Sequence, residues 1–101
     1  MTKRMKPEER KAEILEAALR ATRKCGFASV RIQDIAIEAG CGYGTVSLYF
    51  NTMLQMRRAV MRAAIKREDL AILAQGLGIR DATARKAPQD MKEKAVKTLL
   101  G

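Results

Sequence analysis

The chain has 101 residues, which is enough for one small domain with a single hydrophobic core. Apolar residues account for 48% of it, and 20 Lys and Arg against 11 Asp and Glu give a net charge of +9, which suits a polyanionic partner, nucleic acid before membrane. The absence of His, of a C-x-x-C pair and of a membrane-length apolar run argues against a zinc site, a membrane span and most enzymes.

The same features predict a cellular location. The two cysteines, Cys25 and Cys41, are expected to be reduced, and the start of the chain has no signal-peptide pattern. We therefore expect a cytoplasmic protein, associated with the nucleoid, that is not an enzyme and has no catalytic residue, metal or cofactor.

The charge is distributed unevenly. Residues 1–67 contain fourteen basic and six acidic residues, for a net charge of +8, whereas residues 68–101 contain six and five, for +1. The first two-thirds of the chain is therefore the candidate binding face. The alternative is a basic surface that serves only solubility.

Residues 1–9 are expected to form a basic N-terminal arm, in which Lys3, Arg4 and Lys6 contact phosphates or simply belong to a frayed terminus. Pro7 and the two glutamates after it are typical of a helix start, and Gly26 is typical of a helix end. The apolar spacing predicts a buried face on this helix made of Ile14, Leu15, Ala18, Leu19 and Thr22. Phe27 is expected to turn back into the core.

Residues 32–50 read as two short helices joined by a tight turn. Ile32, Ile35, Ala36 and Ala39 follow the helical period, Ser29 precedes them as a candidate cap, and Gly40 can end the helix in a left-handed conformation. The turn is predicted at Cys41 and Gly42 and the second helix at 43–50. In a basic chain, such a helix-turn-helix most often places its second helix in the major groove of DNA.

A long fourth helix is predicted from Thr52, which has the T-x-x-Q spacing of a capping box with Gln55, to about Gln75. The positions expected to face inward are Met56, Val60, Ala63, Ala64, Leu70, Ala71 and Ala74, and those expected to face outward are Arg57, Arg58, Arg62, Lys66 and Asp69.

Gly76 and Gly78 are expected to interrupt the helical pattern. A short helix at 81–86 capped by Asp81, and a last helix from Pro88, complete the prediction. The expected inner face of the last helix is Met91, Ala95, Val96, Leu99 and Leu100. The fold class is therefore all-α: a three-helix headpiece at 10–51, and a helical tail at 52–101 that closes the core or forms a dimerisation region.

Four sequence blocks together resemble one family of DNA-binding domains. They are I-L-E-A-A-L-R (14–20), C-G-F (25–27), D-I-A-I-E-A-G (34–40) and G-T-V-S-L-Y-F (44–50). Their order and spacing are similar to those of the DNA-binding domain of the tetracycline-repressor (TetR/AcrR) family, over about residues 10–62.

The resemblance implies roles for residues of the second motif helix. Gly42, Gly44 and Thr45 would lie where the backbone approaches phosphates, Tyr43 would reach base edges or phosphates, and Tyr49 would extend its hydroxyl to a phosphate or only pack beside Phe50. The chain departs from the family at four positions: Ser47 replaces a phosphate-contacting Tyr, Met53 a Lys, Gly42 a Ser, and Thr22 a Phe. Arg31 and Gln33 could supply contacts in compensation.

The functional expectation is a small sequence-specific regulator of transcription, a repressor that binds double-stranded DNA as a homodimer. Members of that family usually carry a second helical domain that encloses a ligand, whereas about forty residues follow the headpiece here, so no small-molecule inducer is expected. Control would then depend on protein concentration, proteolysis or a regulatory protein partner. Two alternatives remain open: a helical protein–protein interaction module, and an architectural protein that binds DNA without sequence preference.

Overall fold

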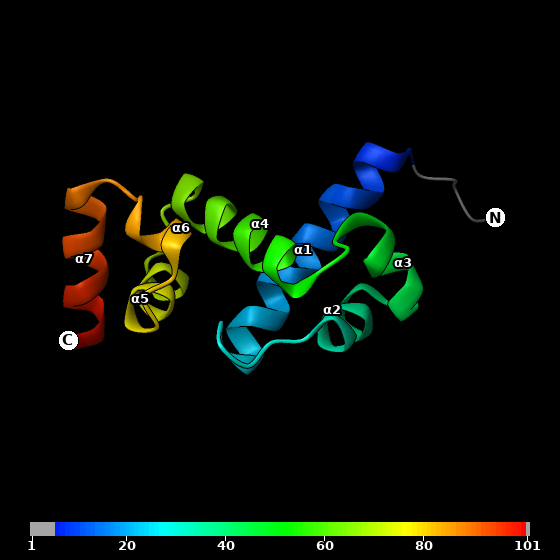
Figure 1. The fold of residues 1–101 in the computed structure, drawn as a ribbon, viewed down its shortest axis with the longest axis horizontal. Coiled ribbons are helices and arrows are strands. Elements are labelled where there is room, and N and C mark those ends of the chain that lie inside the picture. Colours follow the sequence, from blue (N-terminus) through cyan, green and yellow to red (C-terminus); the bar gives the residue numbers. More distant parts are fainter. Residues whose placement is uncertain (1–5, 101) are drawn as a thin grey trace.

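Seven α-helices follow one another in the computed structural model, which describes residues 6–100 and, of Leu100, only the backbone (Figure 1). Their bounds are α1 (Pro7–Cys25), α2 (Ile32–Ala39), α3 (Tyr43–Tyr49), α4 (Met53–Lys66), α5 (Leu70–Gly78), α6 (Ala82–Arg85) and α7 (Gln89–Leu100). The all-α class is confirmed. None of these helices is long and apolar enough to cross a membrane.

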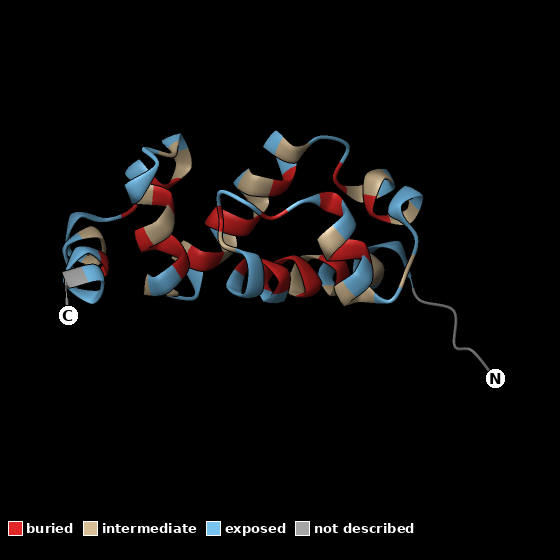
Figure 2. Ribbon diagram, turned by 90° about the horizontal axis from the view of Figure 1, so that it is seen from below, coloured by how far each residue is buried: buried red, intermediate tan, exposed pale blue. Residues whose placement is uncertain are grey.

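The molecule is elongated, with extents of 47 × 22 × 22 Å. Helices α2 and α3 lie near one end and α7 at the other, with α1 and α4 between them (Figure 1). The buried residues lie where helices face one another, and they form one cluster that includes residues from α1 through to α7 (Figure 2).

Helix α1 forms the centre of the headpiece as its apolar spacing predicts. Ile14, Ala18 and Leu19 are fully buried, whereas Leu15 is only half-buried. Thr22, also fully buried, satisfies its hydroxyl by donating to the Ala18 carbonyl oxygen at 2.7 Å.

The end of α1 is held by a contact from the tail. Gly26 has φ 92°, a conformation that a side chain would strain, and the chain then turns Phe27 into the core, where it is 1% exposed. The Phe27 amide donates to the Gln75 side-chain oxygen at 2.6 Å, so α5 and the turn after α1 are joined.

Ion pairs attach the outside of α1 to its neighbours. Glu38 of α2 accepts from Lys24 at 2.9 Å and from Arg20 at 3.2 Å. Asp69 accepts from Arg23 at 2.6 Å, and Glu16 pairs with Arg67 after α4. These basic residues of α1 are exposed as expected, but they serve the packing of the headpiece.

The helix-turn-helix has the predicted bounds, except that Phe50 follows α3 as its cap residue. Gly40 is left-handed, with φ 67° and ψ 35°. The expected cap at Ser29 is wrong: Ser29 is exposed, and α2 begins only at Ile32. The carboxylate of Asp34 takes the capping role by accepting the Arg31 amide at 2.8 Å.

The fourth helix is shorter than predicted. It starts as expected, with Thr52 Oγ1 accepting the Gln55 amide at 3.1 Å, but it ends at Lys66 instead of continuing to Gln75. Glu68 is left-handed, with φ 54°, and Asp69 caps a new helix by accepting the Ile72 amide at 3.3 Å. Asp69 is therefore not on the outer face of one long helix. The break also leaves Ala71 exposed and Leu70 half-buried, against the prediction.

Gly76 does not interrupt a helix, as had been expected, but lies buried inside α5. A Cβ at this position would overlap Met61 Cε of α4 and lie 3.0 Å from the Ala84 Cβ of α6, so the glycine permits the three helices to meet. The short helix α6 forms as predicted, because Asp81 accepts the Ala84 amide at 2.9 Å.

The last helix buries less than predicted. Ala95 of α7 is fully buried and Met91 is half-buried, but Val96 and Leu99 are 44% and 60% exposed. Helix α7 packs on α5 with part of its expected inner face only, and the rest is turned to solvent. The side chain of Leu100, the last member of that face, lies outside the described part.

Candidate nucleic-acid interface

Helix α3 is anchored on one side and exposed on the other. Val46 is fully buried and Phe50, just after the helix, is 3% exposed. Gly42 and Gly44 are exposed, and Tyr43, the first residue of the helix, is 58% exposed. The start of α3 is therefore presented at the surface, as the prediction of a recognition helix requires.

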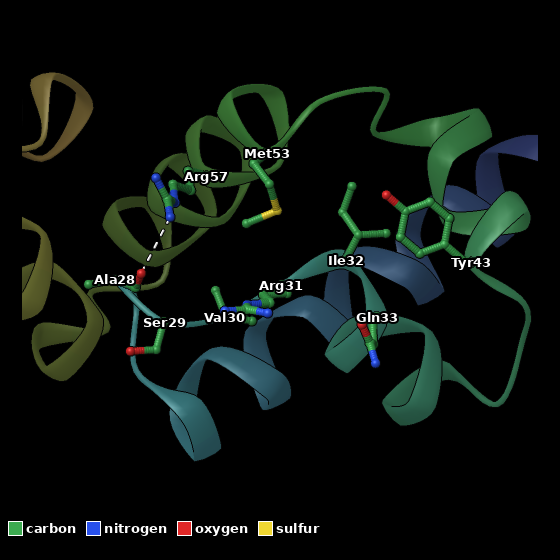
Figure 3. A pocket seen from close by; sticks show the side chains of 9 residues that line it. All are labelled: Ala28, Ser29, Val30, Arg31, Ile32, Gln33, Tyr43, Met53 and Arg57. Atoms are coloured by element: carbon green, nitrogen blue, oxygen red, sulfur yellow. Dashed lines mark hydrogen bonds between the residues drawn. The ribbon is translucent and has the colours of Figure 1, made fainter.

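A surface pocket of about 640 Å³ lies beside the start of α3. Three segments border it: the loop into α2 with the first turn of that helix, the first residue of α3, and the first two turns of α4 (Figure 3). Its lining residues are Ala28, Ser29, Val30, Arg31, Ile32, Gln33, Tyr43, Met53 and Arg57. The pocket brings together three of the predicted contact residues, Arg31, Gln33 and Tyr43, from two different helices and a loop.

Arg57 reaches this pocket from α4. Its Nη2 donates to the Ala28 carbonyl oxygen at 3.4 Å, which attaches α4 to the loop before α2 (Figure 3). Its Nε is buried, and no described residue provides it with a hydrogen-bond acceptor. Arg57 is half-buried, so its predicted place on the solvent face of the fourth helix is corrected.

Tyr49 lies in a different hollow, of about 330 Å³, between α1, α3 and α4. This hollow is bordered by three exposed basic residues, Lys11, Arg58 and Arg62, and by no acidic residue. The Lys11 ammonium lies 6.0 Å from the centre of the Phe50 ring, at the outer range of a cation–π contact. The structure thus separates Tyr49 from the other predicted aromatic contact, Tyr43.

The remaining predicted contacts divide between described and undescribed parts of the chain. Thr45 and Ser47 are half-buried on α3, and Lys6 is exposed just before α1. Lys3 and Arg4 lie outside the described residues. The roles of all these residues in binding stay predictions.

The electrostatic setting of α3 and α4 is uniformly basic. Residues 39–67 contain no Asp or Glu and five Lys and Arg. Within the described residues, Arg31 and Arg57 make no ion pair. By contrast, Arg20, Arg23 and Lys24 of α1 form ion pairs with acidic residues of neighbouring segments. The arginines at the pocket are therefore not neutralised by any described acidic residue, an arrangement that favours a polyanion at the α3 end.

The sequence interpretation missed two polar members of this pocket, Ser29 and Arg57. Ser29 had been assigned a capping role, and Arg57 had been treated as one of several outward charges. The only sequence signal for Arg57 is its position four residues after Met53, which places both on one face of α4. Their meeting with the 28–31 loop depends on tertiary packing.

Comparison with known proteins shows which family the sequence of this chain matches. Residues 14–60 match the family described as bacterial regulatory proteins, tetR family. The chain is also 35% identical over 58 residues to an uncharacterized HTH-type transcriptional regulator, YfiR, of Bacillus subtilis (strain 168). That match covers 57% of this chain and 28% of the relative, so the chain spans well under a third of the relative's length. No solved structure matches significantly.

Proposed function

Residues 14–60 of this chain are a domain of the tetR family of bacterial regulatory proteins, and on that premise we propose that the chain is a DNA-binding regulator of transcription. The observation that carries the proposal is the convergence of Arg31, Gln33, Tyr43 and Arg57 on one open pocket beside the start of α3. Cationic and polar side chains around an exposed helix start suit a duplex with phosphates on the rim of its groove.

In the proposed complex, α3 enters the major groove by its exposed side. The exposed glycines at 42 and 44 would let the backbone come close, and Tyr43, Thr45 and Gln33 would reach base edges or phosphates. Arg31 and Arg57 would neutralise phosphates at the pocket. Because phosphate neutralisation supplies most of the affinity of such complexes, binding should weaken steeply as salt is raised.

Further phosphate contacts belong to the proposal. Tyr49, with Lys11, Arg58 and Arg62 around it, would contact a second stretch of backbone, and Ser47 would add a shorter hydroxyl on α3. Lys3, Arg4 and Lys6 of the basic arm would extend the contact. Such contacts fix the position of the protein on the duplex and carry no sequence information themselves.

We propose that the regulator acts as a homodimer and represses by occupying a promoter. In support of a dimer, an apolar groove of about 480 Å³ between α5 and α7 includes Leu77 and Val96, and Leu99 nearby on α7 is 60% exposed. This surface lies at the opposite end of the molecule from α3 (Figure 1). A two-fold pair would read two half-sites about 34–36 Å apart. The proposed place of action is the nucleoid in the cytoplasm.

Selection from a random duplex pool, followed by sequencing of the bound fragments, tests this function. We expect an enriched site with palindromic half-sites about 10 base pairs apart, centre to centre. Binding that is salt-dependent but enriches no sequence would contradict sequence-specific regulation and favour an architectural role. No binding at low salt would contradict DNA binding altogether.

A further inference from the structure

Leu48 is the most exposed of the large apolar residues in the described part of the chain. Its side chain is 82% exposed and lies on α3. The two anchors of that helix, Val46 and Phe50, are each two residues away, which is about 200° around the helix axis. Leu48 therefore points away from the core, from the last turn of α3.

The surroundings of Leu48 are open. Gly44 precedes it by one turn on the same face, and a Cβ built on Gly44 meets nothing within 4 Å. The outer face of α3 thus consists of bare backbone followed by one protruding hydrocarbon side chain. Tyr43, which borders the pocket beside the start of α3, immediately precedes Gly44 on the same helix.

This inference rests on the proposed function, because it concerns what the outer face of α3 meets in the major groove. Phosphates do not bind a leucine, and most groups on the base edges are hydrogen-bond donors or acceptors. The exception is the C5-methyl group of thymine, which recognition helices contact through apolar side chains. We propose that Leu48 packs against a thymine methyl in each half-site and is a specificity-determining residue of this protein.

The rival occupant of this face is a protein surface, from a second copy or another partner. Two observations favour DNA. The stretch 39–67 that carries α3 has no acidic residue, and Arg31 and Arg57, which form no ion pair among the described residues, lie at the pocket beside the start of α3. The groove suited to a second copy lies at the α5–α7 end instead.

Substitution of deoxyuridine for thymidine tests the inference, because it removes the C5-methyl group and preserves base pairing. Each thymidine of the selected duplex is replaced singly, and affinity is measured by fluorescence anisotropy. For the native protein we expect about a fourfold loss at one thymidine per half-site, the factor for one methyl-sized group removed from water. Leu48→Ala should bind the unmodified duplex more weakly and lose its sensitivity to deoxyuridine at that position only.

Two further variants separate this role from others. Leu48→Val keeps an apolar side chain and should retain part of the discrimination. Ile79→Ala removes another exposed apolar side chain, which follows α5 and lines neither the pocket beside α3 nor the groove between α5 and α7, and it should keep the native deoxyuridine profile. Circular dichroism and thermal melting establish that all variants remain folded, as expected for positions so exposed.

A native profile that is insensitive to deoxyuridine at every position would overturn the inference, as would a Leu48→Ala profile equal to the native one. Both results leave a selected site in place, so the proposed function would survive them. Loss of self-association by Leu48→Ala with unchanged DNA affinity would assign the residue to a protein contact and overturn the inference as well. A pool that yields no enriched sequence overturns the proposed specific function, and the role of Leu48 with it.

Discussion

At the scale of single residues, Arg57 holds two segments of the fold together and also borders the candidate nucleic-acid interface. It spans from α4 to the Ala28 carbonyl oxygen, and it borders the pocket at which Arg31, Gln33 and Tyr43 meet. Its buried Nε lacks a partner among the described residues, and an unsatisfied buried N–H group costs stability. The guanidinium of Arg57 lies at the border of the open pocket, where the proposed phosphate contact would form.

Replacing Arg57 with alanine should weaken binding to specific and random duplexes alike. Because a phosphate contact carries no sequence information, the selected site and a random duplex should lose affinity by a similar factor. The slope of log affinity against log salt should fall by about one. Anisotropy titrations over a range of salt concentrations measure both quantities.

Lys94→Ala is the matched control, since it removes an exposed positive charge from α7, away from the pocket. Its salt slope should stay at the native value. An Arg57→Ala slope equal to the native one would show that Arg57 contacts no phosphate.

Glu38 makes the stability of the headpiece dependent on pH. The hydrogen bond from Lys24, assisted by Arg20, holds the pKa of the Glu38 carboxyl below its ordinary value of 4.5. The folded state therefore resists protonation more than the unfolded state does. The stability from these pairs is fully present above pH 4.5 and is lost as pH falls through the lower folded pKa.

In Glu38→Gln, thermal unfolding should depend less on pH between about 5 and 3 than in the native protein. Melting temperatures at pH 7, 5, 4 and 3 give the comparison. Glu9→Gln is the control, because Glu9 is exposed and forms none of the ion pairs found among the described residues. If Glu38→Gln loses as much stability in acid as the native protein, these pairs do not cause the acid sensitivity.

At the scale of elements, the close contact of α4, α5 and α6 depends on a missing side chain. A Cβ at Gly76 would overlap the Cε of Met61, which is fully buried, and would crowd the Cβ of Ala84. Alanine is the better helix former by about 1 kcal/mol, whereas an added carbon in a filled core costs about 1–3 kcal/mol. The packing term should therefore dominate.

Gly76→Ala is expected to lower the free energy of unfolding by up to about 2 kcal/mol, as measured by urea denaturation. Gly78→Ala is the matched substitution in the same helix: a Cβ there meets nothing within 4 Å. It should change stability by less than about 1 kcal/mol. Equal effects of the two substitutions would mean that α5 does not pack as described.

The elements that the sequence predicted well are those whose ends have local signals. Gly26, Gly40 and Thr52 sit at helix boundaries, as their chemistry requires, and the apolar period identified the buried face of α1. The break between α4 and α5 was missed because it depends on Glu68, a residue with no preference for the left-handed conformation that it adopts. Asp69 was then interpreted as a helix-surface residue instead of a cap.

Only part of the candidate site could be predicted, again because the signals in the sequence are local. Tyr43, Gln33 and Arg31 follow from the helix-turn-helix pattern, which is local in sequence. The contribution of Arg57 depends on a contact between residues 29 positions apart, and the exposure of Leu48 depends on which side of α3 packs on the core. The spacing of apolar residues along the sequence does not show either property.

At the scale of the whole molecule, the two ends have different surfaces. The α3 end has an exposed helix start and two arginines that form no ion pair among the described residues, whereas the α7 end has an apolar groove and exposed Val96 and Leu99. The first surface suits DNA, and the second suits a second copy of the chain. A dimer formed through α7 would leave both copies of α3 free to bind.

A titration of specific and random duplexes with Tyr43→Ala/Thr45→Ala tests most directly whether α3 reads the sequence. Tyr43 is 58% exposed and Thr45 is half-buried, so the fold should tolerate both changes, and circular dichroism should match the native spectrum. We predict that affinity for the selected site falls by at least about tenfold, a loss typical of base contacts, while affinity for random duplex changes much less. Native affinity and native discrimination in this variant would contradict the placement of α3 in the major groove.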